Sequence, residues 1–119
     1  MPTRAPIEYL REICLALPEA TEKEAWGDPT FRVQGKMFVK FSNADKEGRT
    51  TMWCNAGPGA QDALLGSLDE SFFKPPYVGD RGWIGMYLDG EANWGQVAAI
   101  VEDAYRTAAP KKLLPVLDA

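Results

Sequence analysis

The stretch KPPYVGDRGWIGMYLD, which starts at Lys74, holds the side chains whose types and spacing most suggest chemistry. Lys74 and Arg81 are cations that could hold an anion, and Tyr77 and Trp83 are aromatic residues that could line a pocket around it. The alternative is structural: the prolines favour an extended chain, and the glycines permit tight turns into a strand. Asp80 lies next to Arg81 and would offset its charge, so the structural alternative carries more weight.

The chain has no histidine, and this narrows the chemistry that it could perform. The Cys–His and Ser–His–Asp nucleophile systems and the His-containing zinc sites are thereby excluded. The two cysteines, Cys14 and Cys54, show no CxxC spacing and fall on apolar patterns, which indicates reduced, buried thiols. We therefore expect a protein that is not an enzyme and has no catalytic residues, metal site or cofactor.

The elements that must position these side chains follow from the spacing of the apolar residues. Helical spacing alternates irregularly with strand-like segments, and this order differs from a βαβ repeat, so it predicts an α+β domain with a largely antiparallel sheet. Gln34-Gly35 suits a tight hairpin turn, GDPT (27–30) is another turn signal, and Asn93 suits a helix N-cap. The expected helices are 5–17, 56–68 and 93–109, and the expected strands are 21–26, 31–33, 36–42, 50–55 and 82–89.

Alternation along these strands assigns their side chains to two faces of the sheet. One face is apolar and should lie under the helices, whereas the other mixes cations with aromatic rings. The apolar face comprises Phe31, Val33, Met37, Val39, Phe41, Met52, Cys54, Ile84, Met86 and Leu88. The mixed face comprises Arg32, Gln34, Phe38, Lys40, Thr51, Trp53, Trp83 and Tyr87.

A mixed face of this kind has more than one interpretation. Basic and aromatic side chains together can hold phosphates and stack nucleic-acid bases. They can equally pack on one another, with the stems of lysine and arginine over the rings, or be covered by a partner protein.

Length and charge set limits on these alternatives. The 119 residues, 45% of them hydrophobic, fit a single domain over 1–119 that can bury a core. The N-terminus has no apolar signal segment and no run is long enough to cross a membrane, so we expect a cytoplasmic protein. A net charge of −4 repels polyanions, so nucleic-acid binding would need a local basic patch.

Three blocks of the sequence resemble the MmcQ/YjbR family of small bacterial proteins. They are WGDPTFRVQGKMFVKF, PPYVGDRGWIGMYLD and AYRTAAPKKL, and the resemblance extends from the first expected helix to Leu113. It implies a two-layer α+β fold, with helices on one face of an antiparallel sheet, similar to type III secretion chaperones. The family is often labelled DNA-binding, so the resemblance also implies DNA binding. It implies no enzymatic reaction and no catalytic residues. Asp80 departs from the basic, polar or histidine residue often found in that slot of similar sequences, which puts anion binding there in doubt.

These observations predict a non-catalytic binding domain of the MmcQ/YjbR type. The first hypothesis is that its exposed sheet face binds double-stranded DNA. The second is a protein-interaction module or homodimer that uses the same face, and the third is a pocket for a small anionic ligand. The candidate binding residues are Arg32, Lys36, Phe38, Lys40, Trp53, Lys74, Tyr77, Arg81 and Trp83.

Overall fold

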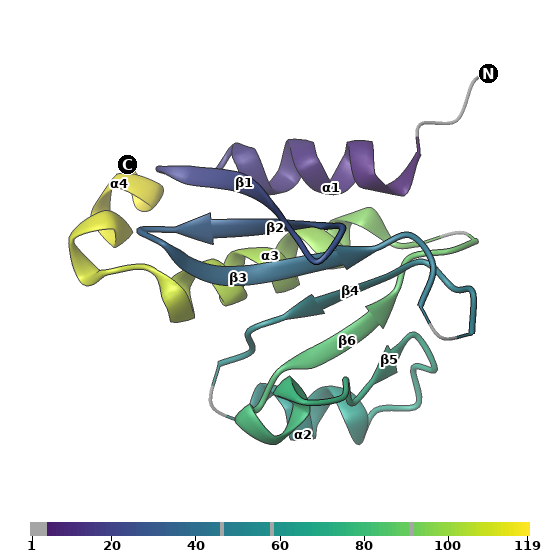
Figure 1. The fold of residues 1–119 in the computed structure, drawn as a ribbon. Coiled ribbons are helices and arrows are strands. Elements are labelled where there is room, and N and C mark those ends of the chain that lie inside the picture. The colour runs from purple at the N-terminus through teal and green to yellow at the C-terminus, as the bar shows by residue number, and fades with distance from the viewer. Residues whose placement is uncertain (1–4, 46, 58, 91) are drawn as a thin grey trace.

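In the computed structural model, which describes residues 5–45, 47–57, 59–90 and 92–119, a six-stranded antiparallel sheet packs against helices (Figure 1). The strand order is β1-β2-β3-β4-β6-β5. The strands are β1 (Ala20–Ala25), β2 (Asp28–Val33), β3 (Lys36–Ser42), β4 (Thr51–Cys54), β5 (Phe72–Phe73) and β6 (Ile84–Tyr87). The helices are α1 (Pro6–Leu15), α2 (Ala60–Leu65), α3 (Trp94–Ala108) and α4 (Leu114–Asp118), with short 3-10 helices η1 (Val78–Arg81) and η2 (Lys111–Leu113).

The long helix α3 forms where its cap and its apolar spacing agree. The side chain of Asn93 accepts a hydrogen bond of 3.0 Å from the backbone N–H of Gln96, which confirms the expected N-cap. Val97, Val101 and Tyr105 recur at helical spacing and are fully buried. Helix α3 therefore presents one apolar stripe to the sheet.

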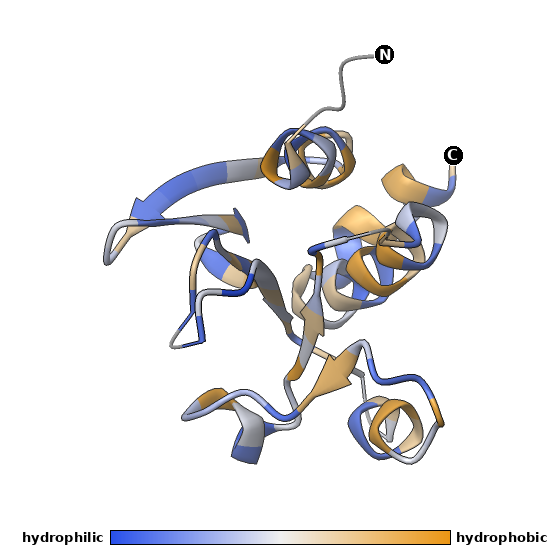
Figure 2. Ribbon diagram, turned by 90° about the vertical axis from the view of Figure 1, so that its right-hand side faces the viewer, coloured by the Kyte–Doolittle hydropathy of each residue, from blue (hydrophilic) through white to orange (hydrophobic). Residues whose placement is uncertain are grey.

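The two layers of the fold are the sheet and the helices on one of its faces. Figure 2 shows α1 and α3 on the same side of the sheet, and the turn between β1 and β2 on the other side. The ring of Tyr105 from α3 packs edge-on against Phe38 of β3, and its hydroxyl donates a 2.7 Å hydrogen bond to the carbonyl of Pro18. The expected α+β architecture, with helices covering one face of an antiparallel sheet, is confirmed.

A β-bulge in β3 makes the face assignment wrong at two positions. Phe31 pairs with Val39 but its neighbour Arg32 pairs with Met37, so Phe38 is an extra residue in its strand. Phe38 is fully buried and packs against α3 instead of lying on the mixed face. Met37 lies opposite Arg32 and is only half-buried. Simple alternation fails here because a bulge shifts the side chains that follow it by one position.

The first hairpin turn also differs from the expected one. It consists of Trp26 and Gly27, with φ of 53° and 81°, and Asp28 already belongs to β2. Positive φ at both central residues is typical of the type I′ turn, whose twist matches that of the strands. The side chain of Trp26 is 85% exposed at this turn. The second turn, at Gln34-Gly35, forms as expected, with φ of 51° and 79°.

Candidate functional site

The face of the sheet opposite α1 and α3 carries a row of side chains across four neighbouring strands. Lys40 of β3 pairs with Trp53 of β4, Trp53 pairs with Gly85 of β6, and Gly85 pairs with Phe73 of β5. Residues that pair directly across an antiparallel ladder share a face, so these residues lie together. We define the open face by this row and its neighbours in register: Arg32, Lys40, Ser42, Thr51, Trp53, Phe73, Gly85 and Tyr87.

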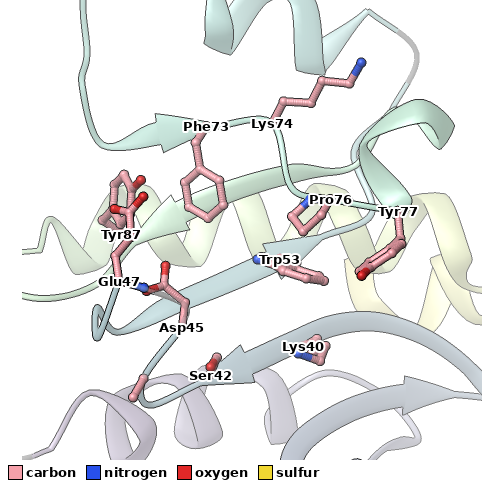
Figure 3. Close-up of a pocket in the computed structure, with 11 residues that line it drawn as sticks. Lys40, Ser42, Asp45, Glu47, Trp53, Phe73, Lys74, Pro76, Tyr77 and Tyr87 are labelled. Carbon is pink, nitrogen blue, oxygen red and sulfur yellow. The ribbon is translucent and has the colours of Figure 1, made fainter.

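A cavity of about 460 Å³ lies on the open face, and we refer to it as the aromatic pocket (Figure 3). Trp53 lies near its centre, with Lys40 on one side and Pro76 and Tyr77 on the other. The lysine Lys74 also lines the pocket, but its side chain points away from the other residues. The full lining is Lys40, Ser42, Ala44, Asp45, Glu47, Trp53, Phe73, Lys74, Pro76, Tyr77 and Tyr87.

Gly85 lies beneath Phe73, one of the residues that line the aromatic pocket. A Cβ atom at this position would lie 2.3 Å from Cε2 of Phe73, so the ring of Phe73 occupies the space that a side chain would take. The ring of Phe73 also packs against Tyr87, with 4.6 Å between the ring centroids. The absence of a side chain at Gly85 therefore lets Phe73 lie over the backbone of β6 next to Tyr87.

Tyr77 is held at the rim of the pocket by a strained turn. Its φ and ψ are 65° and −63°, and the N–H of Val78 donates a 2.7 Å hydrogen bond to the carbonyl of Pro76. This combination is a γ-turn of the rare, strained form. The side chain of Tyr77 is nevertheless 87% exposed, so its own packing contributes little that would offset the strain. Strain of this kind is typical of functional sites.

Two of the cations around the pocket are each paired with a carboxylate. The ammonium group of Lys40 lies 3.1 Å from Asp28 Oδ2 and 4.5 Å from the centroid of the Trp53 ring. Lys74 forms a 3.0 Å ion pair with Asp80. The sequence suggested that Asp80 offsets Arg81, whereas in the structure Asp80 pairs with Lys74.

A third cation, Arg49, is held beside the pocket by Asp89. It donates hydrogen bonds of 3.0 and 2.9 Å to the two carboxylate oxygens of Asp89, and its guanidinium group lies 3.5 Å from the centroid of the Tyr87 ring. The hydrogen bonds from Arg49 hold the pKa of Asp89 below its ordinary value. Arg49 therefore stabilises the position of Tyr87.

Carboxylates occupy the end of the pocket next to Tyr87. One oxygen of Asp45 accepts hydrogen bonds of 2.8 and 2.9 Å from the backbone N–H groups of Glu47 and Arg49, which fixes the loop after β3. In the part of the chain that the structure describes, neither Asp45 nor Glu47 forms an ion pair within 4.0 Å. Lys46, between them in sequence, lies outside the described residues.

The structure brings some of the candidate binding residues together and separates others. Lys40, Trp53, Lys74 and Tyr77 line the aromatic pocket. Arg32 is on the same face, where its Nε donates a 3.2 Å hydrogen bond to the hydroxyl of Thr30. The open face and the aromatic pocket on it therefore gather five of the candidates.

The remaining four candidates lie elsewhere, and one of them, Phe38, is fully buried against α3. Lys36 lines a separate hollow beside the end of α3, and Arg81 lines another, next to Gly57 and Thr107. Trp83, just before the start of β6, is only 9% exposed. The four residues suggested for a small anion pocket, Lys74, Tyr77, Arg81 and Trp83, therefore do not line one cavity in the structure.

The thiols and the acidic residues give no reactive centre within the described ranges. Cys14 and Cys54 are buried, and burial raises the pKa of both thiols, which disfavours the reactive thiolate form. Among the described residues no group of three or more Cys, Asp or Glu side chains could hold a metal ion. Likewise, none of the helices described is long and apolar enough to cross a membrane.

Sequence reasoning did not select Trp26, Phe73 and Tyr87 as binding residues, although all three lie at or near this surface. Trp26 is 85% exposed in the turn between β1 and β2, two residues before Asp28, the partner of Lys40. The Trp-Gly pair gave no signal of a type I′ turn, because Asn, Asp or Gly is the residue favoured at its first position. Phe73 lies in a strand of two residues, which is too short to show alternation.

Comparisons with known proteins agree with this architecture. A family model described as YjbR matches residues 15–107. The crystal structure of Deinococcus radiodurans protein DR2400, with domain DUF419, superposes with a TM-score of 0.74 at 16% identity, covering 98% of this chain and 92% of that one. A structure of a protein from Pseudomonas syringae gives a TM-score of 0.68 at 14% identity, covering 91% of this chain and 99% of that one. The comparison with curated proteins found no match.

Proposed function

The chain belongs to the YjbR family, and from this premise we propose that it is a non-catalytic binding domain that holds an extended segment of a partner protein on its open face. The observation that carries the proposal is the aromatic pocket. Its rings lie on a face that α1 and α3 leave uncovered, and one of them, Tyr77, is kept exposed by a strained turn. Aromatic residues of this kind are the usual anchors of protein interfaces.

An extended segment fits the dimensions of the open face. The row from Lys40 to Phe73 crosses four adjacent strands, and at about 4.8 Å between strands this is about 14 Å. A chain in the polyproline II conformation covers that length with about five residues. Grooves lined with aromatic side chains bind extended chains well because such chains lose little conformational entropy on binding.

Double-stranded DNA, the first hypothesis from the sequence, receives less support from the charges. Lys40, Lys74 and Arg49 each have a carboxylate partner, so a phosphate would have to compete with Asp28, Asp80 or Asp89. Two further expected phosphate contacts, Lys36 and Arg81, line other hollows. DNA affinity depends on the number of phosphates that unpaired cations neutralise, so we favour the protein segment.

The experiment is panning of a random dodecapeptide phage library against the immobilised chain. We expect enriched peptides that bind the wild-type protein in fluorescence anisotropy and lose about tenfold or more in affinity with Trp53→Ala or Tyr77→Gly, because aromatic anchors typically contribute more than 1 kcal/mol. Arg81→Ala is the matched control and should bind as the wild type does.

The same titration with a fluorescein-labelled 20-base-pair duplex at low salt tests the alternative. Tight duplex binding that weakens steeply with salt, combined with no peptide enrichment, would replace the proposal by the DNA hypothesis. Sedimentation at micromolar concentrations checks the remaining alternative, because a dimer that Trp53→Ala dissociates would make a second copy of the chain the occupant.

A further inference from the structure

The charges of the aromatic pocket specify the partner further. Its lining contains two lysines and two acidic residues, but these charges differ in whether they are already paired. Lys40 and Lys74 each pair with a carboxylate outside the lining, namely Asp28 and Asp80. Within the described lining, Asp45 and Glu47 are the charged residues that form no ion pair within 4.0 Å, although the charge of Asp45 contributes to raising the pKa of Arg49.

The position of these carboxylates matters as much as their number. Figure 3 shows Asp45 and Glu47 together at the end of the pocket near Tyr87, whereas Pro76 and Tyr77 lie at the other end. The backbone hydrogen bonds to one oxygen of Asp45 hold its carboxylate in place, and among the described residues none donates a hydrogen bond to the second oxygen. The pocket thus has an aromatic end and an acidic end.

The rings themselves already accept cations from the chain. The ammonium group of Lys40 lies over Trp53, and the guanidinium group of Arg49 lies over Tyr87. An exposed ring face attracts a cation through its quadrupole, and a nearby carboxylate adds to that attraction. At the acidic end Arg49 already lies over the ring of Tyr87 and Phe73 packs against it, so the carboxylates of Asp45 and Glu47 are the acceptors that a ligand cation would meet there.

We propose that the segment bound in the aromatic pocket is apolar or proline-rich over about four or five residues and carries an arginine or lysine that docks beside Asp45 and Glu47. This inference rests on the proposed function, because it specifies the chemistry of the partner of the same site. The apolar residues pack on Trp53, Pro76 and Tyr77, and the cation sets the direction in which the segment lies.

The test uses three fluorescein-labelled peptides of equal length in anisotropy titrations with the full chain. Each contains Ala-Pro-Pro-Leu-Pro followed by two arginines, two citrullines or two glutamates. Citrulline keeps the shape of arginine and removes its charge. We expect the arginine peptide to bind about 3- to 10-fold more tightly than the citrulline peptide, and the glutamate peptide to bind most weakly, as exposed charge pairs would give.

The variant that isolates the acidic end is Asp45→Asn with Glu47→Gln. Asparagine keeps an oxygen for the backbone hydrogen bonds, so the loop should retain its shape, and the preference for arginine over citrulline should disappear. The matched control, Glu24→Gln with Asp103→Asn, changes the net charge equally at exposed residues outside the pocket lining and should keep that preference. Circular dichroism of both variants confirms that they are folded.

The outcomes separate the two proposals. Equal binding of the arginine and citrulline peptides to the wild type would overturn the cation inference and leave the binding of an extended segment intact. The cation inference would likewise be overturned if the pocket variant kept the preference for arginine. Failure of all three peptides, together with no enrichment in the library, would overturn the proposed function itself.

Discussion

The two faces of the sheet differ in how much of their apolar surface is buried. On the face under α1 and α3, side chains such as Phe31, Val33 and Ile84 are fully buried and contribute to stability through the apolar area removed from water. On the open face, Trp53 and Tyr87 remain half-exposed, and Tyr77 is almost fully exposed. The first face is already packed, whereas the second retains apolar surface that a partner could bury.

The contrast between the two faces depends on a few local departures from regular strand geometry, which decide the face on which each residue lies. The bulge at Phe38 turns one aromatic ring towards the core, and the missing side chain of Gly85 lets another, that of Phe73, lie on the open face. Substitutions at such positions therefore test the assignment of these residues to the two faces.

The largest effect should come from the ring that the bulge moved. Phe38→Ala should lower the free energy of unfolding by about 3–5 kcal/mol, because it empties a fully buried site against Tyr105. The matched variant is Met37→Ala at its half-buried neighbour, which should cost clearly less. Urea denaturation measures both, and equal costs would contradict the assignment of these residues to opposite faces.

The next largest effect is expected from a substitution at Gly85, beneath the ring of Phe73. Gly85→Ala should displace the ring of Phe73 and lower the free energy of unfolding by about 1–3 kcal/mol. Binding of the peptides selected by panning should fall as well, because the ring leaves its place beside Tyr87. Gly57→Ala is the control, since its Cβ would make an ordinary 3.5 Å contact with Thr107. If Gly85→Ala and Gly57→Ala change stability and binding equally, the position of the Phe73 ring does not depend on the missing side chain at Gly85.

At Thr51 we expect a substitution that raises the free energy of unfolding instead of lowering it. Its hydroxyl is buried on the open face and has no hydrogen-bond partner within the described part of the chain. Thr51→Val keeps the shape and removes the polar group, so it should raise the free energy of unfolding by about 1 kcal/mol. Thermal denaturation followed by circular dichroism measures this, and a lower melting temperature than that of the wild type would show that the hydroxyl is satisfied in solution.

The smallest effect on stability should come from a substitution at Tyr77. We expect this residue to be second only to Trp53 in its importance for binding. Tyr77→Gly relieves the strained turn but adds chain entropy to the unfolded state, so we expect a change within about 0.5 kcal/mol. Tyr77→Ala removes the same ring without relieving the strain and should be less stable than Tyr77→Gly. A large loss of stability in the glycine variant would make Tyr77 a structural residue.

Regular elements with clear periodicity could be predicted from the sequence alone. The strand at residues 36–42, the turn at Gln34-Gly35 and the cap at Asn93 all form as expected, because local spacing and turn chemistry determine them. The bulge could not be predicted in this way, since it depends on how β3 aligns with β2 and on the space beside Tyr105.

The candidate site was only partly predictable for a related reason. Alternation identified Lys40 and Trp53 on the open face, and composition drew attention to Tyr77. The separation of Arg81 from Tyr77 depends on η1, a short helix that periodicity does not show. The pairing of the lysines with Asp28 and Asp80 is a matter of tertiary structure and has no local signal.

The strand order also has a consequence for the order of folding. Strands β1 to β4 are neighbours in both sequence and space, so each pairing closes only a short loop. The pairing of β4 with β6 must close the whole segment 55–83, and the entropy of closing a loop grows with its length. We therefore expect the hairpins of the first four strands to form early, and the half of the sheet that completes the aromatic pocket to assemble last.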